Sequence, residues 1–420
     1  MLKKKIYLAM SIILIALLIL SFSLIGHSAD IVKEVKIGFL WPLTGGSASI
    51  GSQENDGAQL AIEEINNSGG IKALGGAKIL PILADTQTSP DIGVGQAERL
   101  ILEEKIDLLI GCYNSSVTFP VSEVAQRYKT PMLCMGSVKN EITERGYDYV
   151  FRINNKTTYD VKEMILALTT FEEETGETIK TVGLMYEGSD WGTDTANTLK
   201  IFIEEQGWQI VVDESSTPGQ ADMSPQVIKI KRANPDVLFL ALYTPDQILF
   251  TKTFTANRVN IRLGLMSAGA GTEDLAFYNA TTPEDVEYLF VQDDWNTGGP
   301  DQEEWIAEVA KKCEEKYGYK MMTYFAQGYS TVYVAKEILE MAGSVDKSTI
   351  RETASKIDIT DSPALLTGYQ RIKFDENGQN TYAHGTVSQR QNNKRVVLWP
   401  EGNRTEGAEV IWPIPDWKDR

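Results

Sequence analysis

Histidine is nearly absent from this 420-residue chain, which carries only His27 and His384. Two such distant imidazoles cannot supply the histidine clusters of metal sites or hydrolytic triads. The glycine pairs Gly45-Gly46 and Gly75-Gly76 lack the spacing of a phosphate-binding loop, a nucleophile elbow or a dinucleotide fingerprint. The sequence therefore predicts a protein that is not an enzyme and has no catalytic residues, metal or cofactor.

Cysteine and positive charge are also scarce. The three cysteines, Cys112, Cys134 and Cys313, are too few for a disulfide scaffold. A single bridge between Cys112 and Cys134 stays open, because both should end neighbouring strands. Acidic residues outnumber basic ones by 58 to 40, which gives a formal charge of −18. Nucleic acids and anionic lipid surfaces are bound through basic patches, so we expect this acidic chain to bind neither.

The N-terminus carries the features of an export signal. Residues 3–5 are all lysine, and Ile6–Ile25 is apolar apart from scattered Ser and Tyr. This pattern is typical of a signal peptide, with cleavage after Ser28 or Ala29. The apolar run is also near the length that spans a bilayer, so residues 1–29 are a signal peptide or an uncleaved N-terminal anchor. Either way, we expect the rest of the chain to be periplasmic or otherwise extracytoplasmic.

The remaining chain is too long for one ordinary core and suits two lobes. Short apolar runs alternate with longer amphipathic stretches, which predicts parallel sheets covered by helices. Residues 35–40 predict a strand, and apolar residues at helical spacing from Ala58 to Ile65 predict the helix that follows. Similar units continue until the pattern restarts near Ile153. The predicted fold class is thus α/β, with a doubly wound sheet in each of two lobes.

The C-terminal third departs from this alternation. After Val291 the pattern predicts three helices, at residues 302–317, 324–342 and 347–356, which must complete a lobe that has lacked them. From Ile372 onward the chain is predicted to be β-structure, with a hairpin signal at residues 374–378.

Several stretches resemble a known family. The run from Ala58 to Ile71 (AQLAIEEINNSGGI), the serine-containing loop from Gly111 to Ser122 and the segment Glu141–Tyr147 resemble type I periplasmic binding proteins of the leucine/isoleucine/valine class. The likeness extends through residues 375–378. It implies two Rossmann-like lobes joined by three crossings, with a ligand held in the cleft and closure by hinge motion.

The resemblance places the crossings near Phe151, Gln292 and Tyr382. The helices after Val291 then belong to the first lobe. The predicted division is residues 30–151 plus 293–381 for the N-terminal lobe and 152–292 plus 382–420 for the C-terminal lobe.

Asn114, Ser115 and Ser116 follow a predicted strand, where open α/β sheets bind their ligands. Amides at the start of the next helix, together with the hydroxyls, can hold a carboxylate. The same residues are also typical of a simple helix cap. Their position and the resemblance favour ligand binding.

The resemblance implies further ligand-binding positions. Gly136, Ser137 and Val138 match the next strand end, where a carbonyl takes an ammonium and a hydroxyl takes a carboxylate. Val138 stands where a threonine is expected, so one carboxylate contact is lost unless Ser137 replaces it. Trp191 matches the aromatic that covers the ligand, and Tyr243 matches a second contact.

The family's acid for the ligand ammonium is missing, since residues 266–269 read Met-Ser-Ala-Gly. Asp246, Asp274 or Asp294 could compensate, although each is more typical of a helix cap or a solvated surface. Trp41 and Ile50 are expected to flank the cleft and make the pocket more apolar.

Together these features predict a monomeric solute-binding component of an ABC transporter. It would capture a small carboxylate-bearing molecule, an amino acid or a relative, and deliver it to a membrane permease. The alternative is a sensory module that presents its ligand-bound form to a receptor, which a retained N-terminal anchor would favour.

Overall fold

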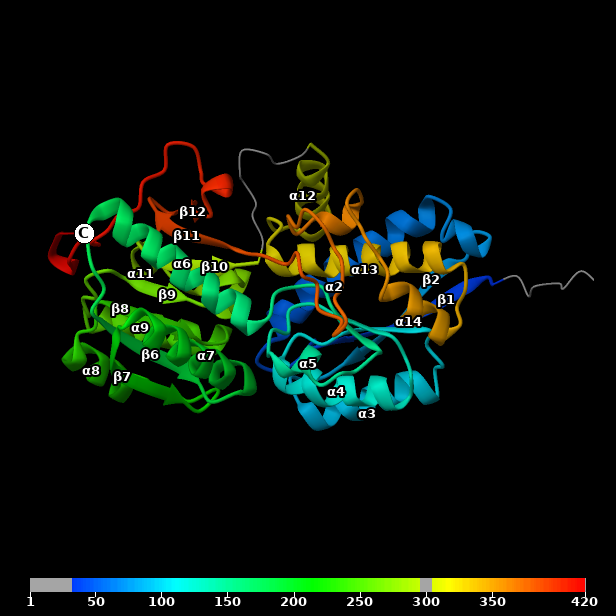
Figure 1. Ribbon diagram of the computed structural model, residues 1–420, viewed down its shortest axis with the longest axis horizontal. Coiled ribbons are helices and arrows are strands. Elements are labelled where there is room, and N and C mark those ends of the chain that lie inside the picture. The colour runs from blue at the N-terminus through cyan, green and yellow to red at the C-terminus, as the bar shows by residue number, and fades with distance from the viewer. Residues whose placement is uncertain (1–31, 295–303, 420) are drawn as a thin grey trace, which may run out of the picture.

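The computed structural model describes residues 32–294 and 304–419. The predicted signal or anchor and the first residues of the helix expected at 302 lie outside them. Two α/β lobes lie side by side along the long axis of the molecule (Figure 1). None of the helices in the described ranges is both long and apolar enough to cross a membrane.

The first lobe is built on a parallel five-stranded sheet in the order β2-β1-β3-β4-β5. Its order reverses between β1 and β3, the arrangement of a doubly wound sheet. The strands are β1 (Glu34–Trp41), β2 (Lys78–Asp85), β3 (Leu108–Gly111), β4 (Met132–Cys134) and β5 (Val150–Arg152).

Alternation along β1 divides the core of this lobe into two layers. Ile37 and Phe39 pack into one cluster with the helices α2 (Ala48–Asn67) and α13 (Thr323–Ala342). Leu40 faces the opposite cluster, which α3 (Pro90–Leu102) and α4 (Ser115–Arg127) cover. Successive side chains of a strand point to opposite faces, so an apolar run of this kind becomes a strand buried on both sides.

The late helices pack on the first lobe, as the pattern predicted. Besides α13 they are α12 (Glu304–Tyr317) and α14 (Lys347–Ala354), and residues of all three join the cluster that holds β1. Helices α2 and α13 approach closely because glycines meet at their crossing. A methyl group on Gly328 would overlap the backbone of Glu54, and one on Gly57 would overlap the carbonyl of Phe325.

The second lobe is built on a seven-stranded sheet in the order β12-β11-β10-β9-β8-β6-β7. Its first five strands in sequence are parallel, and the last two add an antiparallel hairpin at one edge. These strands are β6 (Thr181–Glu187), β7 (Gln209–Ser216), β8 (Val237–Ala241), β9 (Leu265–Ser267), β10 (Phe290–Asp293), β11 (Thr386–Gln391) and β12 (Lys394–Trp399).

Helices cover both faces of this sheet too. Val182 and Phe239 pack with α6 (Thr157–Thr175) and α7 (Asp190–Gln206). Leu238 and Leu240 face the other cluster with α8 (Ser224–Ala233) and α9 (Thr244–Ala256). The short helices α10 (Leu275–Ala280) and α11 (Pro283–Val286) lie between β9 and β10, and α5 (Glu141–Glu144) precedes β5.

The chain passes between the lobes three times, after β5, after β10 and before β11. The fold prediction of two doubly wound lobes joined by three crossings is confirmed. The residue boundaries assigned to the lobes at 151, 292 and 382 stay predictions.

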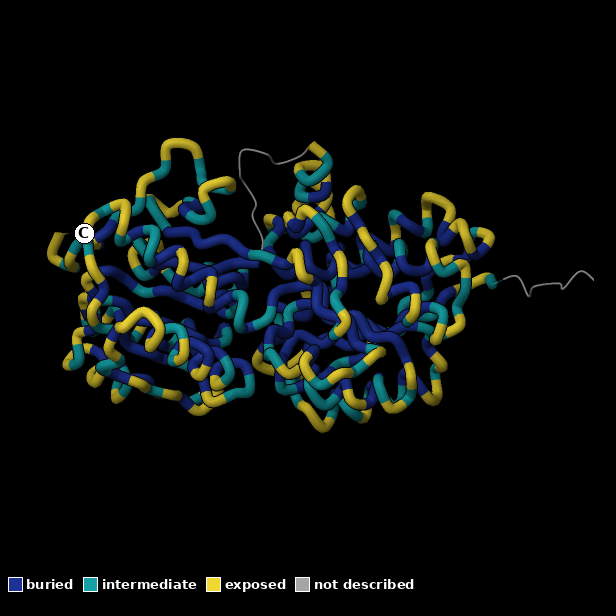
Figure 2. Tube along the Cα trace, viewed as in Figure 1, coloured by how far each residue is buried: buried dark blue, intermediate teal, exposed yellow. Residues whose placement is uncertain are grey.

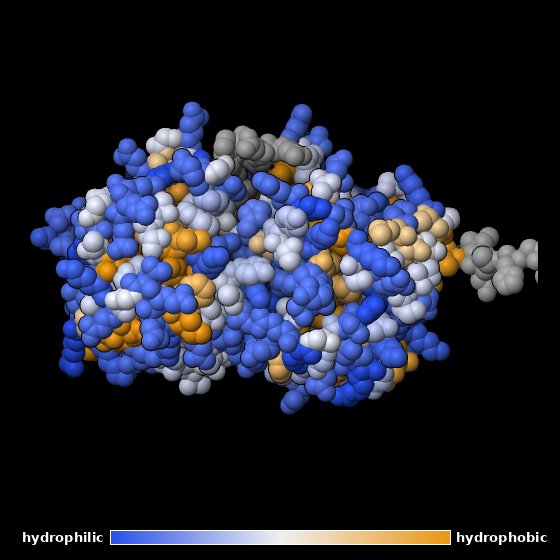
Figure 3. All heavy atoms as spheres, viewed as in Figure 1, coloured by the Kyte–Doolittle hydropathy of each residue, from blue (hydrophilic) through white to orange (hydrophobic). Residues whose placement is uncertain are grey.

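Burial follows this two-lobed arrangement, with the strands of both sheets buried and the outer turns of the helices exposed (Figure 2). The face drawn in Figure 3 is mostly hydrophilic, as the acidic composition predicts. Cys112 and Cys134 do lie at the ends of the neighbouring strands β3 and β4, but both are free thiols. The bridge left open by the sequence is therefore not formed.

Candidate ligand-binding site

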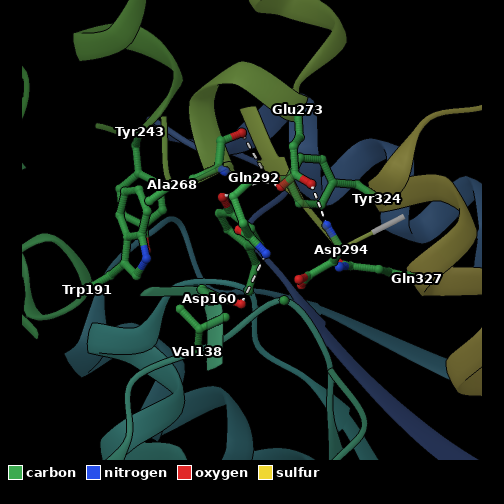
Figure 4. Close-up of a pocket in the computed structure, with 13 residues that line it drawn as sticks. Val138, Asp160, Trp191, Tyr243, Ala268, Glu273, Gln292, Asp294, Tyr324 and Gln327 are labelled. Atoms are coloured by element: carbon green, nitrogen blue, oxygen red, sulfur yellow. Dashed lines mark hydrogen bonds between the residues drawn. The ribbon is translucent and has the colours of Figure 1, made fainter. Parts of the chain in front are cut away.

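A cavity lies where the carboxyl ends of the two sheets face each other (Figure 4). Loops that follow β3, β4, β8 and β9 contribute to its walls, as expected for open α/β sheets. Its volume is only about 30 Å³, room for one or two waters. The residues that line it are Tyr113, Gly136, Val138, Asp160, Trp191, Tyr243, Ala268, Ala270, Glu273, Gln292, Asp294, Tyr324 and Gln327.

Aromatic rings from both lobes meet in the cavity. Trp191, the second residue of α7, stacks on Tyr243 with 4.7 Å between ring centroids. Tyr243 in turn contacts Tyr113 of the first lobe at 5.6 Å, and Tyr113 packs edge-on against Tyr324 at 5.2 Å. Trp191 is 4 % exposed, so its large apolar face is withdrawn from water against Tyr243. This row of rings closes one side of the cavity.

The N-terminus of α4 meets this row at Tyr243. Asn114 is the N-cap residue of α4 and forms no side-chain cap bond, donating instead to the Ser47 hydroxyl at 2.9 Å. The hydroxyl of Tyr243 faces the backbone amide of Ser115 and the side chain of Asn114, which favour negative charge on it. The amide donors expected to hold an anion thus face a phenol oxygen from the other lobe.

The structure brings together only part of the predicted site. Gly136, Val138, Trp191 and Tyr243 line the cavity, whereas Asn114 and Ser115 do not line it and lie near the Tyr243 hydroxyl. Ser116 is part-buried in the first turn of α4 and does not line the cavity.

Ser137 does not replace the hydroxyl that Val138 lacks. Its side chain is fully buried and donates to the carbonyls of Cys112 and Tyr113, at 2.6 and 2.7 Å. It therefore braces two neighbouring loops of the first lobe. Trp41 likewise belongs to the core of the first lobe rather than to the cavity wall, whereas Ile50 does pack beside Tyr113 and Tyr324.

An acid that the sequence did not single out stands at the second-lobe wall. Glu273 lies in the short 3-10 turn after β9, and its Oε2 is 2.8 Å from where a Cβ on Gly269 would be. It accepts hydrogen bonds from the amides of Ala270 and Asp294, at 3.2 and 3.1 Å, and from the Tyr324 hydroxyl at 3.3 Å. Burial, and then the nearby Asp293, raise the pKa of Glu273.

More carboxylates gather beside Glu273. Asp294 lines the cavity and accepts from Asn155 at 3.2 Å, and burial raises its pKa to about 7. Asp160 of α6 lines it as well, with its pKa raised by burial and by Asp294. Glu163 lies one turn further along α6. This wall of the cavity is therefore rich in hydrogen-bond acceptors.

The three acids considered from the sequence have different surroundings. Asp294 faces the cavity, while its neighbour Asp293 points away to Arg395, at 2.8 Å. Asp246 accepts from the Gly219 amide outside the cavity wall. Asp274 caps α10 and also accepts from Ser49 of the first lobe at 2.7 Å.

Polar contacts join the lobes around the cavity. Besides the bond between Ser49 and Asp274, Lys139 pairs with Asp190 at 2.9 Å, and the Tyr324 hydroxyl donates to the Ala270 carbonyl at 2.9 Å. The cleft is closed. The free space of about 30 Å³ is far smaller than an amino acid.

The sequence carried a signal for the α4 loop but little for the acidic wall. Serines at a strand end mark a candidate site by position alone, whereas Glu273 sits in a polar turn that looks like a surface loop. Within the described ranges, no group of three or more His, Cys, Asp or Glu is arranged to hold a metal ion.

Comparison with known proteins places the chain in a family. Residues 34–393 match the model of the periplasmic binding protein family, so the chain belongs to that family. It is 29% identical over 389 residues to Leu/Ile/Val-binding protein homolog 7 of Brucella abortus (strain 2308), covering 89% of this chain and 93% of that one.

Solved structures share the fold. One is the branched-chain amino acid transporter substrate binding protein LivJ from Streptococcus pneumoniae in complex with isoleucine, with a TM-score of 0.75 and 21% identity over 88% of this chain and 100% of that chain. Another is a solute binding protein of an ABC transporter from Rhodopseudomonas palustris BisB5 in complex with 3,4-dihydroxy benzoic acid. Its TM-score is 0.74 and its identity 19%, over 89% of this chain and 99% of that chain.

Proposed function

We propose that this protein is the extracytoplasmic solute-binding component of an ABC transporter. It closes around a small carboxylate-bearing solute, an amino acid or a relative, and delivers it to a membrane permease without catalysing a reaction. The observation that carries the proposal is the cavity between the carboxyl ends of the two sheets, where the start of α4 faces a lid from the other lobe.

The α4 N-terminus supplies the seat for the carboxylate. The Tyr243 hydroxyl of the other lobe faces the Ser115 amide and the Asn114 side chain. An incoming carboxylate would take the same donors and, being charged, would bind them more strongly than a phenol does. The helix dipole adds to this preference.

The opposite wall suits the ammonium group of an amino acid. Glu273 occupies the space next to Gly269, the last residue of the stretch where the family's acid was expected. Asp294 and Asp160 add further acceptors within the same cavity. A zwitterion would thus find a donor end and an acceptor end on opposite sides.

The permease is inferred from the relatives. The family consists of periplasmic binding proteins, and structures of the same fold include components of ABC transporters that hold isoleucine or an aromatic acid. The N-terminal export signature agrees with delivery from outside the cytoplasm. We propose a monomer, since each chain forms a complete cleft.

A variant at the start of α4 tests the seat. Proline at position 115 would remove the backbone amide donor. It should still be tolerated, because proline suits the first turn of a helix and Asn114 already has the extended conformation (φ −71°, ψ 128°) that a following proline requires. We expect Ser115→Pro to weaken amino-acid binding about 100-fold or more, while the melting temperature without ligand changes little.

The measurement is a thermal-shift and calorimetric titration of the purified protein with L-amino acids and with their carboxamides. Ser115→Ala is the matched control, because it keeps the amide and loses only the hydroxyl. Equal binding of acids and carboxamides, or unaltered binding by Ser115→Pro, would refute the carboxylate seat. If no amino acid shifts the wild-type protein, the proposed ligand class is wrong.

A further inference from the structure

A buried acid at the first-lobe end of the cavity has no partner. Glu54 lies on α2 and is 1 % exposed, and neither of its carboxylate oxygens has a hydrogen-bond partner. Burial alone raises its pKa. The side-chain oxygen of Gln327 on α13 is also buried and unpartnered. Three acceptors thus lie in the interior without a donor.

These acceptors converge behind Gly136. A Cβ at that position would lie 3.2 Å from Oε1 of Glu54, 3.4 Å from Oε1 of Gln327 and 3.0 Å from the Tyr113 ring. Gly136, Gln327 and Tyr113 all line the cavity, and Gln327 reaches into it from α13 (Figure 4). Because Gly136 has no side chain, Oε1 of Glu54 lies close behind this part of the cavity wall, although Glu54 itself does not line the cavity.

An unmet carboxylate in the interior is expensive, so the arrangement points to a missing donor. Exchanging the oxygen and nitrogen positions of the Gln327 side-chain amide would provide a donor for at most one of the two Glu54 oxygens. None of the residues lining the cavity in the described structure is Lys, Arg or His. The lining residues thus supply no cation for Glu54, and a cationic solute would bring both the donor and the charge.

The surroundings also suit the stem of a longer solute. Ile50, Tyr113 and Tyr324 form a small apolar cluster one helical turn from Glu54 along α2. Such a surface can cover methylene groups while leaving a charged tip free to reach a carboxylate. Tyrosine faces also attract cations.

We propose that Glu54 and Gln327 form a subsite for the terminal ammonium group of a basic amino acid. This inference rests on the proposed function, because the solute's carboxylate is assigned to the α4 seat. An aliphatic side chain in the same place would leave all three acceptors buried without donors. The preferred ligand class is thus diamino acids rather than leucine, isoleucine or valine.

Paired ligands test the subsite on the purified wild-type protein. Lysine and norleucine share one carbon skeleton and differ by the terminal nitrogen, so calorimetric titration with both isolates that group. We expect lysine or its shorter homologue ornithine to bind at least about tenfold more tightly than norleucine. Tighter binding of norleucine or leucine than of lysine and ornithine overturns the proposal. Tighter binding of glutamine than of either diamino acid would show that the subsite does not prefer a cation.

Variants of Glu54 assign the effect to the residue. Glu54→Leu should invert the preference, so that norleucine binds better than lysine, and Glu54→Gln should reduce lysine affinity about tenfold without lowering the melting temperature of the free protein. Glu205→Gln, an exposed acid on α7, is the matched control for lost charge. If Glu54→Leu does not fold, Glu54→Gln decides: unchanged selectivity refutes the subsite.

The two proposals can fail separately. Lysine binding that Ser115→Pro abolishes and Glu54→Gln leaves unaltered would retain the carboxylate seat and reject the cation subsite. Absence of binding by every amino acid, including lysine and ornithine, would reject both.

Discussion

The two sides of the cavity are built from opposite chemistry. At the start of α4, a backbone amide and a side-chain amide face the hydroxyl of Tyr243, and neither carries a full charge. At the second-lobe wall, Glu273, Asp294 and Asp160 present acceptors whose pKa values burial raises. The donor end is a product of helix geometry, whereas the acceptor end depends on acids brought together from distant segments.

Replacing Trp191, the predicted lid, should have the largest effect on ligand affinity, because a lid covers both the donor end and the acceptor end of the cavity. Trp191 is buried against Tyr243, and its removal would admit water to the cavity. We expect Trp191→Ala to weaken binding of the best ligand about 100-fold or more, and Trp191→Phe to lose much less because an aromatic face remains. Calorimetric titration measures both, and equal affinity of the alanine variant and the wild type would exclude a lid role.

A change at the acceptor end of the cavity should have the second-largest effect on ligand affinity. Glu273→Gln keeps the size of the side chain but removes the charge that would face the solute's ammonium. We expect about tenfold weaker binding of amino acids, with little change for the matching carboxylic acids that lack the amino group. An equal loss for both kinds of ligand would mean that Glu273 supports the loop after β9 rather than binding the ammonium.

A change at the donor end of the cavity should raise ligand affinity rather than lower it. Tyr243→Phe removes a hydroxyl that faces the Ser115 amide and would compete with a carboxylate for it. Without this competitor we expect affinity to rise roughly fivefold. Weaker binding instead would show that the hydroxyl itself contacts the solute.

The smallest effect should appear in the pH dependence of stability. Burial raises the pKa of Glu163 from 4.5 to about 8, and its carboxylate accepts from the Gly385 amide at 2.9 Å. Between these values the folded chain holds a proton that the unfolded chain releases, so this contribution is complete below pH 4.5 and is lost as the pH rises through 8.

The Glu163→Gln variant has no carboxyl group to titrate at this position, so its free energy of unfolding should fall less as the pH rises. We expect urea unfolding free energies to fall by roughly 1 kcal/mol less between pH 5 and 8 than in the wild type, because the neighbouring Asp294 and Asp160 still titrate. Parallel pH curves for the two proteins would show that Glu163 is ionised in the folded state across this range.

The sequence predicted the two-lobed α/β fold because its signals are local. Apolar runs of strand length, amphipathic stretches between them and the helices after Val291 each follow from the pattern of neighbouring residues. The serine loop before α4 was also visible, since a strand end that leads into a helix marks a candidate binding position.

Only the tertiary structure decided the chemistry of the cavity. Glu54, Glu273 and Gln327 are polar residues in unremarkable helices and turns, and their burial depends on how α2, α13 and the loop after β9 pack. Ser137 and Trp41, expected near the ligand, instead turn to neighbouring carbonyls and to the core. Periodicity determines which face of an element is buried, but the meeting of acids from distant segments depends on long-range packing that no short stretch of sequence encodes.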